Sequence, residues 1–139
     1  KRVSEYFRME RRSRQVDEKT FQTVFDKISD FLPQGWKKMV FFAGYTSGSY
    51  SMKFYSENGD GKYMDCFQIP GISKGQLMKA FMDIDHVLSE QRKDLGSKAW
   101  TVFTMAADAN GRMRTDFEYD DHSRDMVSYE KSWEEKYLV

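Results

Sequence analysis

Residues 108–120 read DANGRMRTDFEYD, and they carry the clearest strand pattern in the chain. Asn110 and Gly111 suit a tight hairpin turn, because both residue types tolerate positive φ. After the turn, apolar and polar side chains alternate with a period of two. The apolar set is Met113, Thr115, Phe117 and Tyr119, and the polar set is Arg112, Arg114, Asp116, Glu118 and Asp120. The stretch predicts a hairpin whose second strand, 113–119, has one packed and one polar face.

Four earlier stretches also predict strands. They are residues 38–45, 50–56, 62–69 and 99–106. Glycines and polar residues separate them, as at 57–61 (ENGDG), which predicts a further hairpin turn.

Three stretches have helical spacing instead. The first follows Asp17, a candidate N-cap, and ends at Pro33. The second follows Ser73 as N-cap and is expected to stop at Gly96 and to cover one face of the sheet. The third spans about 123–137. Their apolar stripes are Phe21, Val24, Phe25, Ile28, Phe31 and Leu32; Leu77, Phe81, Ile84, Leu88 and Leu95; and Met126, Tyr129, Trp133 and Tyr137.

The element order is therefore α-β-β-β-α-β-β-α. Short connections between strands favour antiparallel pairing, so we expect an α+β fold with a mostly antiparallel five-stranded sheet packed by helices. Residues 17–139 are expected to form a single domain. Residues 1–16 are Arg-rich and are predicted to be an N-terminal arm or a helix extension.

The composition limits the possible functions of the 139 residues. Lys and Arg number 22, as do Asp and Glu, so the net charge is zero, which argues against a general nucleic-acid binder. No apolar stretch is long enough for a transmembrane helix, and no signal-peptide pattern opens the chain. The single cysteine, Cys66, fits a reducing compartment. We therefore expect a cytoplasmic protein.

Motifs for catalysis are missing from the sequence. It has no phosphate-binding glycine loop, no Cys-x-x-Cys pair and no Gly-x-Ser-x-Gly elbow. His86 and His122 are interpreted as independent surface histidines, Cys66 as a half-buried structural thiol, and residues 58–61 as a plain turn rather than a calcium loop. We expect no enzymatic activity, no cofactor and no metal.

An acidic strip is the strongest functional signal. Residues 107–139 hold nine acidic and five basic residues, whereas residues 1–20 hold seven basic and four acidic residues. The strip can be a solvated polar face, or it can be a docking surface for a basic partner, because such charges give steering and specificity. The candidate contact residues are Arg114, Asp116, Glu118, Tyr119, Asp120 and Asp121, with Asp125 nearby.

Two alternatives stay open. The Arg-rich residues 1–16 could serve a small nucleic-acid-binding or regulatory module, whose binding should fall steeply with salt. The second alternative is an enzyme built around Cys66 or His122. Activity screens with alanine variants of these two residues would reveal it.

Several ordered motifs resemble the YezG-type immunity proteins, which are antitoxins of bacterial polymorphic toxin systems. The resemblance covers roughly residues 20–139. The motifs are Phe31-Leu32-Pro33-x-x-Trp36, the apolar run 40–43, the aromatic stretch 50–55, Trp100-Thr101-x-Phe103-Thr104, the Gly111 turn, Phe117-Glu118-Tyr119-Asp120-Asp121, and Trp133-x-x-Lys136-Tyr137-Leu138.

The resemblance implies a non-catalytic function. Such proteins bind the toxic domain of a cognate effector, commonly a nuclease, and block it. We therefore expect an immunity protein that is a monomer or weak dimer alone and a heterodimer with its toxin, with no direct contact to nucleic acid or membrane. Family members are often acidic overall, whereas this chain is neutral, so the local strip is the expected contact surface.

Overall fold

The computed structural model describes residues 18–139, so the predicted arm at 1–16 and the predicted cap Asp17 lie outside the described residues. The observed order confirms the predicted α+β succession. The elements are α2 (Glu18–Ser29), β1 (Lys38–Thr46), β2 (Ser49–Glu57), β3 (Met64–Asp65), α3 (Lys74–Lys93), β4 (Val102–Asp108), β5 (Met113–Glu118) and α4 (Met126–Tyr137), with short 3-10 helices at Cys66–Gln68 and Gly96–Lys98.

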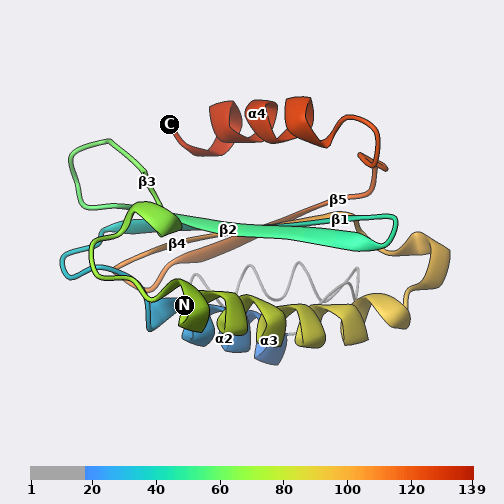
Figure 1. Cartoon of the computed structure of the whole chain (residues 1–139), viewed down its shortest axis with the longest axis horizontal. Helices are drawn as coiled ribbons and strands as arrows, with labels where there is room; N and C mark the ends of the chain where they lie inside the picture. Colours follow the sequence, from blue (N-terminus) through green and yellow to red (C-terminus); the bar gives the residue numbers. More distant parts are fainter. Residues whose placement is uncertain (1–17) are drawn as a thin grey trace.

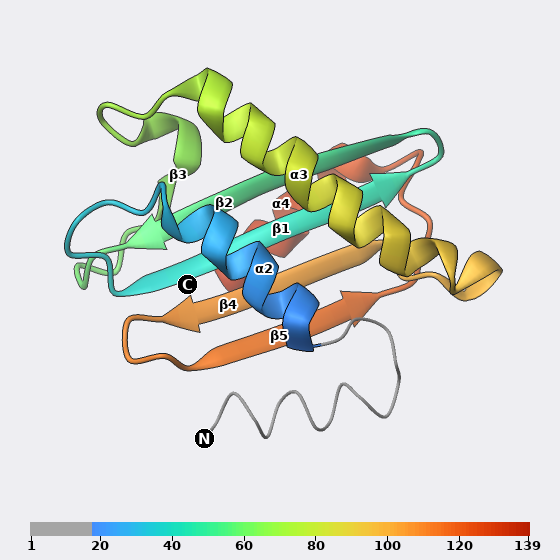
Figure 2. The ribbon, with the colours of Figure 1, turned by 90° about the horizontal axis from the view of Figure 1, so that it is seen from below.

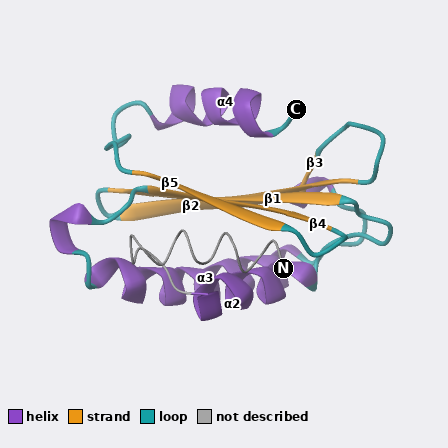
Figure 3. Ribbon diagram, turned by 180° about the vertical axis from the view of Figure 1, so that it is seen from behind, coloured by secondary structure: helices purple, strands orange, loops and turns teal. Residues whose placement is uncertain are grey.

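The five strands form one sheet in the order β3-β2-β1-β4-β5, and each neighbouring pair is antiparallel. The layers are clear in Figure 1, where α2 and α3 lie on one face of the sheet and α4 lies on the other. Figure 3 shows the same three layers from behind. Both faces of the sheet therefore carry helices.

The larger core lies between the sheet and the pair α2 and α3, which run side by side across it (Figure 2). Alternate strand residues point into this layer, as the period of two predicts. Phe21 of α2 stacks on Phe103 of β4 with ring centroids 5.9 Å apart. The fully buried members with the largest side chains are Trp100, Phe21, Phe41, Phe54, Phe103, Ile28, Met39, Leu77, Ile84, Leu88 and Met105.

A smaller core lies on the opposite face, beneath α4. Strand residues of the other parity supply it, together with Trp133. Its buried members are Val40, Phe42, Tyr55, Val102 and Trp133. The second face of the sheet is thus not a simple solvated polar face, and α4 covers part of it.

The predicted strand 62–69 is wrong in most of its length. Only Met64 and Asp65 pair with β2, and a 3-10 helix follows at once. The Asp65 carboxylate accepts the N–H of Phe67 at 2.8 Å, and the Gln68 side chain accepts the N–H of Asp65 at 3.2 Å. This capping box stabilises a helical turn where alternation alone favours a strand.

Helix boundaries follow local capping. Ser73 caps α3 as predicted, because its Oγ accepts the N–H of Gln76 at 3.3 Å. Helix α2 ends at Ser29, earlier than the expected stop, and Phe31 and Leu32 pack against the core from turns. Among residues 18–139, no helix has the length and apolar character needed to span a bilayer.

Candidate partner-binding surface

Trp133 fixes α4 on the sheet. Its side chain is 3% exposed, and its ring meets that of Phe42 edge-on at a centroid distance of 5.0 Å. Its indole Nε1 donates a hydrogen bond of 2.9 Å to Thr104 Oγ1 on β4. Burial of this aromatic ring, with its N–H satisfied, determines where α4 lies.

Two tyrosines of α4 reach the acidic strip on β5. The Tyr129 hydroxyl donates to Glu118 Oε2 at 2.5 Å, and the Tyr137 hydroxyl donates to Asp116 Oδ2 at 2.7 Å. Arg114 forms an ion pair of 3.1 Å with the same Asp116 oxygen. Arg114, Asp116 and Glu118 therefore already have side-chain partners, and the two carboxylates tie α4 to the sheet.

The hydrogen bonds of Tyr129 and Tyr137 make the free energy of unfolding depend on pH in the alkaline range. Burial is the largest cause that raises the pKa of Tyr129 and of Tyr137 above the ordinary value of 10.0, and the neighbouring carboxylates add to it. The folded protein thus holds these protons more tightly than the unfolded chain. Their contribution is complete well below pH 10.0, the ordinary tyrosine pKa, and it is lost progressively as the pH rises through and above that value.

We expect the free energy of unfolding to fall between about pH 9 and about pH 11, measured by urea denaturation. Tyr129→Phe/Tyr137→Phe serves as the matched variant, since it keeps the rings and removes both titrating hydroxyls. Its stability should change less steeply with pH. An equal slope in the two proteins would show that these tyrosines do not cause the dependence.

The accessible part of the strip lies just after β5. Tyr119 is 51% exposed, and Asp120 and Asp121 are exposed. The backbone here is fixed, because Thr101 Oγ1 donates to the Asp120 carbonyl at 2.6 Å. The Asp121 carboxylate accepts from Ser123 N and Oγ, and these bonds lower its pKa. Asp120, Asp121 and Asp125 lie in the connection from β5 to α4. We call them the acidic end of the sheet face that carries α4.

His122 is not the surface histidine that the sequence predicted. Its side chain is 13% exposed, and its ring stacks on Tyr129 at a centroid distance of 3.9 Å. Its Nδ1 lies 3.1 Å from Asp125 Oδ1. His86, in contrast, is exposed on α3. Within residues 18–139, no three His, Cys, Asp or Glu side chains gather as a metal site would require.

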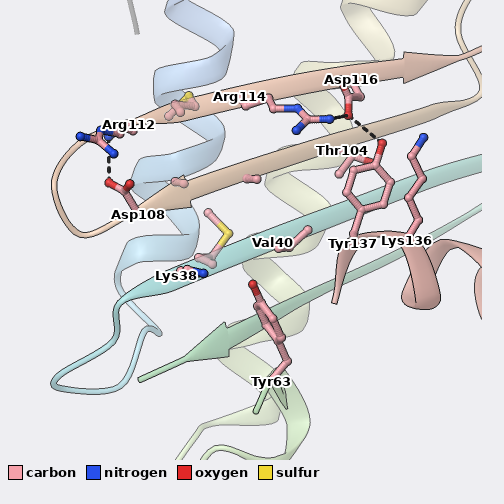
Figure 4. A pocket seen from close by; sticks show the side chains of 14 residues that line it. Lys38, Val40, Tyr63, Thr104, Asp108, Arg112, Arg114, Asp116, Lys136 and Tyr137 are labelled. Atoms are coloured by element: carbon pink, nitrogen blue, oxygen red, sulfur yellow. Dashed lines mark hydrogen bonds and ion pairs between the residues drawn. The ribbon is translucent and has the colours of Figure 1, made fainter. Parts of the chain in front are cut away.

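A pocket of about 370 Å³ lies on the same face, at the other end of β5 (Figure 4). Sequence reasoning missed this pocket, because its lining comes from separate segments that only the fold brings together. The charged and aromatic side chains that line it are Lys38, Tyr63, Asp108, Arg112, Arg114, Asp116, Lys136 and Tyr137.

Cys66 is fully buried, more than the half-burial predicted, and it lies in the 3-10 helix after β3. Burial raises the pKa of its thiol to about 11. A buried thiol with a raised pKa is a poor nucleophile, unlike a catalytic cysteine. The position of Cys66 therefore gives no support to an enzyme built around it.

Iodoacetamide is expected to alkylate Cys66 at least about a hundredfold more slowly in the folded protein than in urea at the same pH. Mass spectrometry of timed samples measures both rates. Because Cys66 is the single cysteine, the signal needs no site assignment. Similar rates in the two states would contradict the burial of this thiol.

Comparison with known proteins relates the chain to one family and to a curated relative. Residues 18–139 match the family described as "Immunity protein YezG-like". The chain is also similar to "Immunity protein YezG" of Bacillus subtilis (strain 168), with 24% identity over 128 residues, which cover 85% of each chain. The family match includes the whole described region, with the sheet, the three helices and the surface beside α4.

Proposed function

Because the chain belongs to the YezG-like family of immunity proteins, we propose that it binds a cognate bacterial toxin and neutralises it by direct contact. Members of this family are typically non-enzymatic inhibitors. The family match over residues 18–139 is the observation that carries the proposal. The toxin domain is proposed to be a nuclease, and the complex to be a heterodimer that forms in the cytoplasm.

The acidic end is suited to such a target. A nuclease needs a positive groove to hold phosphates, and carboxylates can fill the same groove. Asp120, Asp121 and Asp125 are exposed on a backbone held by hydrogen bonds, so their charges have defined positions. Opposite charge also accelerates encounter between two proteins.

The six candidate residues have two proposed roles. Tyr119, Asp120 and Asp121 are proposed to touch the toxin directly, with Tyr119 as the aromatic anchor. The remaining residues, Arg114, Asp116 and Glu118, are proposed to border the contact and to hold α4 beside it. The hydrogen bonds of Asp116 and Glu118 to Tyr137 and Tyr129 support this division.

Co-expression with the toxin encoded next to the gene tests the proposal. Cells that express the toxin alone should stop growing, whereas co-expression should restore growth and yield a one-to-one complex on purification. An unrelated immunity protein at the same expression level is the control. Continued toxicity without co-purification, with every protein folded and expressed, would contradict the proposed function for this toxin.

A further inference from the structure

The pocket lies on the same face of the protein as the acidic end but has the opposite charge. Its floor is apolar, since Val40 and Ala106 are paired across β1 and β4 and both line it. Lys38 starts β1, Arg112 follows the hairpin turn and Lys136 lies in the last turn of α4 (Figure 4). The fold thus brings three segments together around one concave site.

The carboxylates near these cations are already engaged. Asp108 Oδ1 accepts the backbone N–H groups of Asn110 and Arg112, at 2.9 and 3.1 Å. Asp116 Oδ2 accepts from Tyr137 and Arg114. Glu57 pairs with Lys38 in the strand register, and its two oxygens accept the N–H groups of Gly59 and Gly61.

The cationic side chains of Lys38, Arg112 and Lys136, in contrast, still have N–H donors that can bind an anion. Within residues 18–139, Lys38, Arg112 and Lys136 form no ion pair within 4.0 Å. The Lys136 ammonium lies 5.1 Å from the centroid of the Tyr137 ring, a contact that leaves its N–H donors free. The pocket therefore offers several N–H donors above an apolar floor, which suits a group with an apolar stem and an anionic head.

The pocket and the acidic end are close enough together for a single protein interface to include both. Strand β5 has 6 residues, which at about 3.3 Å each separate the two ends by about 20 Å. A stable protein interface covers about 800 Å² on each partner, a patch roughly 30 Å across. A partner whose contact area is centred between the two ends would therefore cover both the acidic end and the pocket. Buried cations without a counter-charge would oppose that docking.

We infer that the pocket receives an aspartate or glutamate side chain from an acidic segment of the toxin. This inference rests on the proposed function. The stem of the acidic residue would lie on Val40 and Ala106, and its carboxylate would meet Arg112 and Lys38. Lys136, beside Tyr137 at the other end of the pocket, would add positive charge without touching the carboxylate (Figure 4). The toxin would thus present a basic surface to the acidic end and an acidic anchor to the pocket, which gives the complex a single orientation.

Charge reversal at Arg112 tests the inference by calorimetry with the purified toxin domain. Arg112→Glu should raise the Kd at least about tenfold. Lys74→Glu is the matched control, because it makes the same change in net charge at an exposed site of α3, on the opposite face. Its Kd should stay within about threefold of the wild-type value. Lys38→Glu, at the same end of the pocket, provides a second pocket variant if Arg112→Glu does not fold.

A charge swap completes the test. Asp and Glu residues of the toxin are changed to Lys one at a time and measured against Arg112→Glu. At least one toxin variant should bind Arg112→Glu more tightly than the unchanged toxin does. If the wild-type protein binds but neither pocket variant weakens binding more than Lys74→Glu does, the pocket inference is wrong and the proposed function stands. If the wild-type protein does not bind, the proposed function and this inference both fail.

Discussion

Replacement of Trp133 by alanine is expected to lower the free energy of unfolding by about 3–5 kcal/mol, the largest loss from any single change in α4. Trp133 is the one buried residue of that helix. Its ring packs on Phe42 and Tyr55, and its N–H is bonded to Thr104. The substitution leaves a cavity and removes the main contact between α4 and the sheet. Urea denaturation followed by circular dichroism measures the loss.

Two variants separate the causes of this loss. Trp133→Phe keeps an aromatic ring but leaves Thr104 without its donor, so about 1–2 kcal/mol should be lost. Val127 is 88% exposed on the same helix, and Val127→Ala should stay within about 0.5 kcal/mol of the wild type. A loss below about 1 kcal/mol for Trp133→Ala would contradict its role in holding α4.

Reversal of Asp120 and Asp121 to lysine is expected to slow association with the toxin at least about tenfold and to abolish protection in cells. Both residues are exposed, and they would face the phosphate-binding groove of a nuclease. The loss of the Asp121 bonds to Ser123 should cost only about 1 kcal/mol of stability. Stopped-flow association rates at several salt concentrations are the measurement, because steering weakens with salt.

The matched control reverses two acidic residues elsewhere. Glu90 and Asp94 lie at the C-terminal end of α3, on the other face of the sheet, and Glu90→Lys/Asp94→Lys makes the same change in net charge. Its association rate should be close to that of the wild type. Equal rates for the two double variants would show that the acidic end does not meet the toxin. Asp116 and Glu118 are unsuitable for this test, because their reversal also removes the acceptors of Tyr137 and Tyr129.

Much of the fold follows from local patterns in the sequence. Strand β5 alternates apolar and polar residues, β1 is a short apolar run between turn residues, and the cap at Ser73 depends on a bond to a residue three positions away. The predicted strand 62–69 failed for an equally local reason, because the capping residues Asp65 and Gln68 outweigh its alternation. Short apolar stretches favour strand and helical turn alike when no cap is considered.

The candidate surface was only partly predictable. The alternation of apolar and polar residues placed Asp116 and Glu118 on the less apolar face of β5, as the structure has them. The alternation does not show which other element covers that face. The tyrosines that bond to them lie 11 and 21 residues away in the chain. The pocket was missed for the same reason, since Lys38, Arg112 and Lys136 line one pocket only through the order of the strands and the position of α4.

The most direct test of the central claim is a titration of the purified toxin domain with this protein, with toxin activity as the readout. We expect activity to fall linearly and to disappear at one molar equivalent, with a complex of the two chains on size-exclusion chromatography. The Trp133→Ala variant should inhibit less, because its α4 is loosened beside the acidic end. Full toxin activity in the presence of excess folded wild-type protein would contradict neutralisation by direct binding.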